Sequence, residues 1–491
     1  MTKPELTIFI TLAVGITASL GILLRLFSDS EAMIALVAIV LSAIIAYKYP
    51  RTGLWTLLIY LPFSGSVTYS LGYGHIFFHL LKDAFYFPAL IALIQVQPNL
   101  NPFFKLVKPL ITALIFLLAV CLITLLAVHL PQQLIAQSSE RPVLMWIFGS
   151  KVLIGYIPLI LCAYYLIRDQ QDLFFLTRLQ VIVVLICCSL GLIQYILLVT
   201  GICEGSNNIA AYLDEPTLDA RCFVGGSLLY SANWGNGLIR LPGTFVAPWQ
   251  WAWFLISSIF FTYASSTSDS SPRWRVVSWV ATVMVLLMSV ISGQRVALVL
   301  TPVILLILSL LTVKAKHWFL TNLGIIFLGV LIASNLELVQ NRWENLVGRW
   351  QASPPDEFIV RQFHWAMNSQ EGVLGNGLGT ATNAARIFGE TRFIETYYAK
   401  LFYEMGPLGI LAFLAVVSIL TLLCFKALRS LQQTNLRRLG ICLWVFVLVI
   451  SYNTFYYPLD VDPVAIYYWF FAGVLLKLPE LEAQEISPEK I

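Results

Sequence analysis

The sequence predicts an all-α, polytopic membrane protein, with about 12–14 transmembrane helices in a single domain over residues 1–491. Three observations lead to this prediction. The chain is 59% hydrophobic and only 11% charged, far from the composition of an average soluble domain. Its hydrophobic residues form long runs, and its basic residues are concentrated in every second connection between those runs.

The apolar runs are long enough to cross the hydrocarbon layer, which takes roughly 20 residues per helix. The first run is too long for a signal-peptide core and lacks a small-residue cleavage site, so we expect it to be kept as a span. Fourteen candidate spans lie at about 6–27, 32–48, 53–71, 79–96, 109–129, 146–167, 179–200, 246–264, 276–291, 296–313, 318–334, 402–425, 439–455 and 463–476.

The basic residues orient the bundle, because Lys and Arg collect in cytoplasmic loops. With both termini cytoplasmic, every inner connection carries at least two of them. These residues are Lys48, Arg51, Lys105, Lys108, Arg168, Arg178, Arg273, Arg275, Lys314, Lys316, Lys426, Arg429, Arg437 and Arg438. The outer side then holds two long loops, about 201–245 and 335–401, and we expect function there because the inner turns are short.

Six of the eight cysteines fall within spans and are expected to pack as small apolar residues. The other two, Cys203 and Cys222, share the first long outer loop, where they either form a disulfide or remain two unrelated thiols. No CxxC or HExxH motif occurs and the five His residues are scattered. The sequence therefore predicts no protein-built metal site.

Three arginines stand on the outer side at helix mouths. Arg240 precedes the span at 246–264, Arg295 lies in a Ser-Gly-Gln-Arg turn between two apolar runs, and Arg361 lies in "SPPDEFIVRQFHWAMNSQ". The start of that segment has the N-cap, proline and acidic residues of a helix N-terminus, and its apolar residues predict an amphipathic helix on the membrane surface. Each arginine alone is explained by snorkelling or ion pairing. Together they suit a diphosphate, which Arg binds bidentately.

A glycine-rich stretch, "EGVLGNGLGTATN", follows Arg361 and contains Gly375, Gly377 and Gly379. It is either a flexible re-entry turn or a loop whose backbone N–H groups approach a sugar or phosphate. Next comes "FIETYYAKLFYEMGPLGILAFL", in which Glu395 is a candidate general base for an acceptor hydroxyl. A salt-bridge role for this carboxylate stays open. No P-loop or Rossmann motif is present, which favours a lipid-linked diphosphate over a nucleotide.

The order of "RLPGTF", "SGQR", "GVLGNGLG" and "ETYYAKLFYEMGPLG" resembles the O-antigen ligase and O-antigen polymerase superfamily of bacterial envelopes, over residues 237–412. The resemblance implies a GT-C-like bundle in the bacterial inner membrane with a large extracytoplasmic loop, here 335–401. It also implies an inverting, metal-independent glycosyltransferase without cofactors. Its partners would be an undecaprenyl-diphosphate-linked glycan donor, a glycan or lipid-glycan acceptor and membrane lipid, with no nucleic acid. Arg240, Arg295 and Arg361 would bind the donor diphosphate.

The chain departs from the ligase pattern at one position, because true ligases tend to carry His-Asn where this chain has Glu395-Thr396. Glu395 would then take the place of the base. This difference leaves a ligase, a polymerase and an exopolysaccharide-type transferase open. Two other classes also stay open: an anion transporter of the bicarbonate type, although no internal repeat is found, and a non-catalytic scaffold for envelope assembly.

Overall fold

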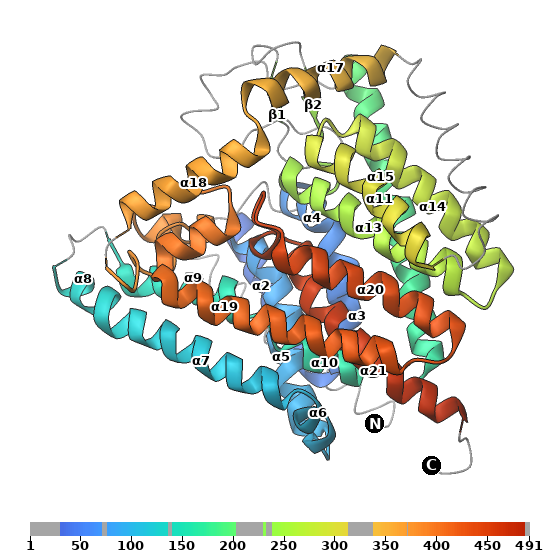
Figure 1. Ribbon diagram of the computed structural model, residues 1–491, viewed down its shortest axis with the longest axis horizontal. Helices are drawn as coiled ribbons and strands as arrows, with labels where there is room; N and C mark the ends of the chain where they lie inside the picture. Colours follow the sequence, from blue (N-terminus) through green and yellow to red (C-terminus); the bar gives the residue numbers. More distant parts are fainter. Residues whose placement is uncertain are drawn as a thin grey trace. The chain divides into compact units, whose positions relative to one another are not determined.

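The computed structural model describes residues 30–70, 76–135, 140–202, 229–231, 238–312, 337–370 and 372–486. Within these ranges the regular elements are helices, apart from one antiparallel pair of three-residue strands (Figure 1). The predicted all-α, polytopic class is confirmed. The chain forms two compact units. The expectation of one membrane domain stays a prediction.

Unit 1 comprises Met1–Leu100, Gln171–Thr262 and Val276–Pro302. Helices α2 and α3 both pack on α5 in this unit. Its elements are α2 (Ser30–Lys48), α3 (Pro50–Tyr60), η1 (Leu61–Phe63), α4 (Ser64–Ser70), η2 (Ile76–Leu80), α5 (Leu81–Val96), α11 (Gln170–Val199), β1 (Leu229–Ser231), β2 (Leu238–Arg240), most of α13 (Pro248–Ser268), most of α14 (Pro272–Ile291) and the start of α15 (Arg295–Thr312).

Unit 2 comprises Asn101–Gln170, Tyr263–Arg275 and Val303–Ile491. Its longest helix, α19, contacts α7, α18, α20 and α21 (Figure 1). The elements are α6 (Asn101–Leu106), α7 (Lys108–Thr124), the π-helical turn η3 (Leu125–His129), α8 (Leu130–Ile135), α9 (Pro142–Ile154), α10 (Leu159–Leu166), α17 (Glu337–Ala352), α18 (Pro355–Ser369), η4 (Asn383–Phe388), α19 (Tyr397–Ser430), α20 (Thr434–Tyr452), η5 (Pro458–Asp460) and α21 (Val464–Ile486).

In the part of the chain that the structure describes, nine helical segments are long and apolar enough to cross a membrane. They correspond to nine of the predicted spans, so the chain is a multi-pass membrane protein. The segments 32–48, 53–71 and 246–264 are also helical, although 53–71 is divided by the 3₁₀ turn at Pro62, and their crossing stays a prediction. The segments 6–27 and 318–334 lie outside the described residues.

Helix α13 shows how polar side chains are accommodated inside the apolar bundle. Its hydroxyls donate to backbone carbonyls of the preceding turn, as Ser257 does to Trp253 at 2.7 Å and Thr262 does to Ser258 at 2.8 Å. Each hydroxyl is thereby paired within its own helix, which removes the cost of burying an unmade hydrogen bond. Serine and threonine are therefore compatible with full burial of this helix.

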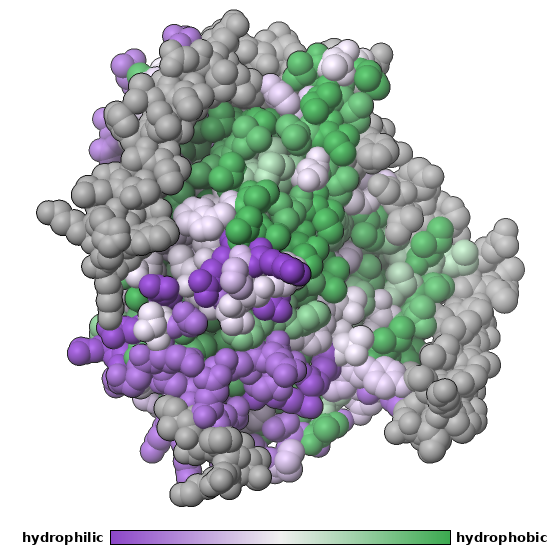
Figure 2. Space-filling model, turned by 90° about the vertical axis from the view of Figure 1, so that its right-hand side faces the viewer, coloured by the Kyte–Doolittle hydropathy of each residue, from purple (hydrophilic) through white to green (hydrophobic). Residues whose placement is uncertain are grey.

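The surface separates apolar from polar side chains. On the face in Figure 2, hydrophobic side chains cover a broad tract and hydrophilic ones gather beside it. On α7 and η3, Ile115, Leu122 and Leu126 are 61%, 52% and 63% exposed on one stripe. Such exposure of large aliphatic side chains is expected where a helix faces lipid.

The cysteines follow the expectation in part. Cys121, Cys162, Cys187, Cys188, Cys424 and Cys442 are free and buried, in agreement with a packing role. Cys203 and Cys222 lie outside the described residues, and their disulfide stays a prediction.

Candidate functional site

Two of the predicted arginines belong to adjoining segments of unit 1. Strand β2 ends at the half-buried Arg240, and the next residue, Leu241, donates its backbone N–H to the Ser292 carbonyl at 3.0 Å. Ser292 opens the Ser-Gly-Gln-Arg turn, and α15 begins at its Arg295. The segments "RLPGTF" and "SGQR" therefore meet, although some 50 residues separate them in sequence.

A buried amide holds the turn that follows Arg240. The Gln194 side chain, in α11, accepts a bond from the Gly243 N–H at 3.1 Å and lies with its Nε2 at 3.5 Å from the Gly243 carbonyl. Gly243 has a φ of +57°, and a Cβ there would lie 2.5 Å from the Trp251 ring. The turn requires glycine for both reasons. Ser66 of α4 adds a backbone bond to the Thr244 carbonyl at 3.1 Å.

The third arginine, Arg361, lies on the exposed side of α18 in unit 2. The sequence pattern predicts that the apolar side of this helix lies on the membrane surface, but much of that side packs on protein instead. Phe358 meets Phe455 edge to face, Phe363 packs on Phe402, and Trp365 stacks on Tyr403. An apolar stripe predicts that one side of a helix is buried, but it does not show whether lipid or protein covers that side. The expected membrane contact and the observed protein contact differ for this reason.

Glu395 lies just before α19 and is half-buried. Its backbone N–H donates to the side-chain oxygen of Gln362 in α18 at 3.2 Å, so the structure brings Glu395 beside the residue that follows Arg361. The start of α19 is further fixed by a bond of 2.7 Å from the Tyr397 N–H to the Thr454 carbonyl. Burial raises the pKa of the nearby Tyr457 phenol, and the Glu395 and Asp460 carboxylates add to the shift.

The glycine-rich loop is turned toward the protein interior. Gly375, Gly377 and Gly379 have φ values of +70°, +110° and +100°. A Cβ would lie 2.7 Å from α19 backbone at Gly375, 2.7 Å from the His129 ring at Gly377 and 2.2 Å from the Met145 carbonyl at Gly379. These glycines permit close packing, and their binding of a sugar or phosphate stays a prediction.

A kink in α19 explains why the loop docks there. Gly406 has a non-helical φ of +65°, and Pro407 has no N–H to donate. The Tyr403 and Glu404 carbonyls accept instead from loop N–H groups, those of Asn376 at 2.9 Å and Gly377 at 3.0 Å. The loop therefore provides hydrogen bonds to carbonyls beside the kink.

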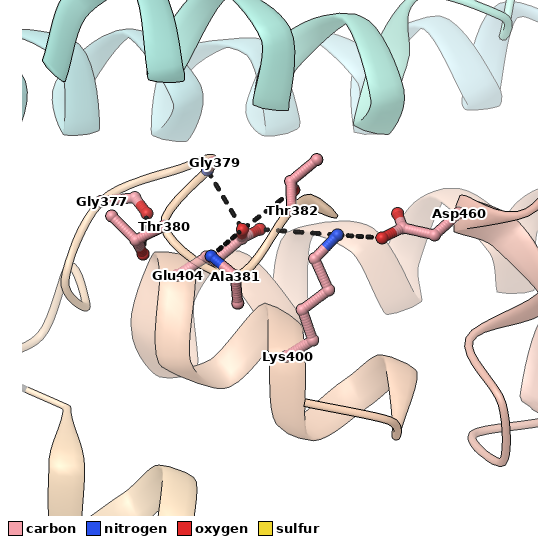
Figure 3. A network of polar contacts seen from close by, with 8 residues as sticks. All are labelled: Gly377, Gly379, Thr380, Ala381, Thr382, Lys400, Glu404 and Asp460. Carbon is pink, nitrogen blue, oxygen red and sulfur yellow. Dashed lines mark hydrogen bonds and ion pairs between the residues drawn. The ribbon is translucent and has the colours of Figure 1, made fainter. Parts of the chain in front are cut away.

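A buried polar network completes the loop's attachment (Figure 3). One oxygen of Glu404 accepts from the Gly379 N–H at 3.1 Å, the Ala381 N–H at 2.8 Å and the Thr382 hydroxyl at 3.0 Å. The other oxygen lies 4.0 Å from the Lys400 ammonium, which also binds the Asp460 carboxylate. Because Glu404 and Lys400 are fully buried, each charge depends on these partners.

No sequence motif indicates the roles of Gln194, Gln362, Lys400 and Asp460. The signal for Lys400 was its position four residues before Glu404 at the start of an apolar helix, where an ionisable residue requires a partner. The two glutamines gave no comparable signal, because they pair with backbone groups distant in sequence.

The structure thus groups the predicted residues in two pairs. Arg240 and Arg295 belong to unit 1, whereas Arg361 and Glu395 belong to unit 2. Their convergence on one cavity stays a prediction. No group of three or more potential metal ligands occurs among the described residues.

Comparisons with known proteins add no family. No protein-family model matches the chain, and no curated protein matches it.

Proposed function

We propose that this protein is a membrane glycosyltransferase of the O-antigen ligase or polymerase type. It would act at the outer face of the bacterial inner membrane, with both termini cytoplasmic. The donor would be a glycan on a polyprenyl diphosphate, and the acceptor a hydroxyl of a glycan or lipid-glycan. The observation that carries the proposal is the hydrogen bond from Leu241 to Ser292, which joins the two arginine-bearing segments of unit 1.

In this proposal Glu395 takes the proton of the acceptor hydroxyl, and the acceptor oxygen attacks the anomeric carbon of the donor sugar. The bond between that carbon and the diphosphate oxygen breaks as the new glycosidic bond forms. The diphosphate leaves with the bonding electron pair, and Arg240, Arg295 and Arg361 stabilise its charge. A single displacement inverts the configuration at the anomeric carbon.

The fixed backbone around Glu395 supports the assigned role of its carboxylate. The Gln362 bond and the Tyr397–Thr454 bond hold the start of α19, so the position of a base placed there is defined before substrate binds. Lys400 and Glu404 lie five and nine residues after Glu395, and Asp460 of η5 completes their network. Glu404 attaches this helix to the glycine-rich loop.

Analysis of lipid-linked glycans in a strain that lacks the protein tests the function. We expect the polyprenyl-diphosphate donor to accumulate and the product glycan to disappear. Restoring the normal chain should reverse both changes, whereas Glu395→Gln should restore donor binding without restoring product. Unchanged donor and product, together with altered uptake of a small anion, would replace the proposal with the transporter alternative.

A further inference from the structure

The turn between β2 and α13 is surrounded by polar side chains that have no hydrogen-bond partner within the part of the chain that the structure describes. The atoms concerned include the Ser66 hydroxyl and the Nε2 of Gln294, whereas the Thr244 hydroxyl contacts the Cys187 thiol, which is a weak hydrogen-bonding group. Thr244 is fully buried and Gln294 is 7% exposed. Buried polar groups are nearly always paired, so an unpaired group requires an explanation such as a ligand or ordered water.

Backbone contacts place these three residues around the same turn in unit 1. The Ser66 N–H binds the Thr244 carbonyl, and a Cβ at the neighbouring Gly65 would lie 2.0 Å from the Phe245 backbone. Gln294 is anchored by its backbone N–H, which donates to the Ser292 hydroxyl at 3.2 Å. Since Ser292 also binds Leu241, the three residues belong to the same cluster as Arg240 and Arg295.

The chemistry of the three groups defines the ligand that they suit. The unpaired atom of Gln294 is the amide nitrogen, which can only donate, and both hydroxyls can turn to donate. The fixed positive charges in the cluster come from Arg240 and Arg295. Helix α15 begins at Arg295, so its first N–H groups also face this end of the helix. Donors and cations together match an anion whose oxygens only accept.

We infer that Ser66, Thr244 and Gln294 are diphosphate-binding residues that act with Arg240 and Arg295. This inference rests on the proposed function, because it assigns further contacts to the same donor. The arginines supply charge, and the hydroxyls and amide supply neutral hydrogen bonds to the remaining phosphate oxygens. The Ser66 hydroxyl and the Gln294 amide nitrogen thereby gain partners that the described part of the chain does not provide.

Binding of farnesyl diphosphate and inorganic pyrophosphate to the purified full chain in detergent tests the inference. We expect Thr244→Val and Gln294→Leu each to weaken binding of both probes by about tenfold, since each removes a hydrogen bond to a charged oxygen. Thr301→Val is the matched control, because that hydroxyl already donates to the Ala297 carbonyl at 2.8 Å. It should bind both probes as the normal chain does. Farnesyl monophosphate should bind more weakly than the diphosphate.

The possible failures are distinct. If the normal chain binds pyrophosphate and farnesyl diphosphate while Thr244→Val and Gln294→Leu bind them equally well, the inference is wrong and the donor class stands. If the normal chain binds neither probe, the donor class of the proposed function is wrong and the inference falls with it. If Thr244→Val does not fold, Thr244→Ser replaces it, because serine keeps the hydroxyl. Normal diphosphate binding by Thr244→Ser, together with weakened binding by Gln294→Leu, supports the inference. Normal binding by both variants would contradict it.

Discussion

The side chain of Gln362 accepts a hydrogen bond of 3.2 Å from the backbone N–H of Glu395, across 33 positions of sequence. Gln362 belongs to α18, as does Arg361, and Glu395 immediately precedes α19. The bond therefore fixes the proposed base relative to the helix that carries one of the proposed diphosphate ligands. It makes Gln362 a positioning residue in the proposed transfer reaction.

Replacing Gln362 by Leu should lower kcat for glycan transfer by roughly tenfold, because the Glu395 N–H loses its acceptor and the base loses a fixed position. KM for the donor should change little. Gln362→Glu retains an acceptor oxygen and should recover much of kcat, which a purely structural role in packing would not require. Asn368→Ala, at an exposed position of the same helix, is the control. A rise in KM for the donor as large as the fall in kcat would contradict a positioning role for Gln362.

Arg295→Lys keeps the positive charge but loses the planar fork that binds two phosphate oxygens. Transfer should fall by roughly tenfold or more, since a hydrogen bond to a charged group contributes about 1.5–3 kcal/mol. The measurement is product formation from a lipid-linked donor in membranes that contain equal amounts of each variant. Arg273→Lys, which alters an exposed residue in the first turn of α14, is the control. Full transfer by Arg295→Lys would exclude a bidentate role.

Lys400→Met should destabilise the protein by about 3–5 kcal/mol, because it leaves the fully buried Glu404 carboxylate and the partly buried Asp460 carboxylate without their cation. The thermal midpoint of unfolding in detergent measures the effect. Asp460→Asn in the same chain should recover part of the loss by removing one of the two negative charges. The matched control is Lys426→Met, which alters an exposed lysine on the same helix. A midpoint equal to that of the control would show that the network contributes no stability.

Gly406→Ala and Gly372→Ala form a matched pair, since their φ values are +65° and +66°. A Cβ at Gly406 would lie 2.1 Å from the Val373 carbonyl, whereas none of the described atoms lies within 4 Å of a Cβ at Gly372. Both variants acquire backbone strain of about 1 kcal/mol or more. Gly406→Ala should lose about a further 1–3 kcal/mol from overpacking. Equal unfolding midpoints would contradict the close approach of loop and helix.

Reporter fusions test the orientation that the basic residues predict. A fusion after residue 370 should report an extracytoplasmic position, and one after residue 432, beside the basic residues at 426–438, a cytoplasmic one. A cytoplasmic signal at 370 would contradict both the topology and the outward-facing site.

Hydropathy located the helices well, because a chain in lipid must satisfy its backbone within long apolar helices. Twelve of the fourteen predicted segments are helices in the described ranges. The contacts around the site were harder to predict. Lys400 and Asp460 are 60 positions apart, and Gln194 and Gly243 are 49 apart. Their pairing is a property of tertiary packing, which neither the period of a helix nor the spacing of a motif contains.

The residues that surround the arginines could not be predicted from the sequence either. A charge beside an apolar run predicts that some partner is needed, but it does not identify that partner. The sequence therefore predicts Arg240 and Arg295 as site residues. Only the structure shows that a backbone bond between Leu241 and Ser292 joins their segments. In α18, the pattern predicted an apolar side correctly, and the packing of Phe363 and Trp365 on α19 determined what that side contacts.

The kink at Gly406 also sets an order of events during biosynthesis. The ribosome makes the glycine-rich loop before the first turns of α19, yet the carbonyls that receive the Asn376 and Gly377 N–H groups belong to Tyr403 and Glu404. Until those residues leave the ribosome, the two amides lack the carbonyls that accept from them in the folded protein. The helix thus acts as the template for the segment translated before it, and a nascent chain that stops short of Tyr403 lacks the surface on which this loop folds.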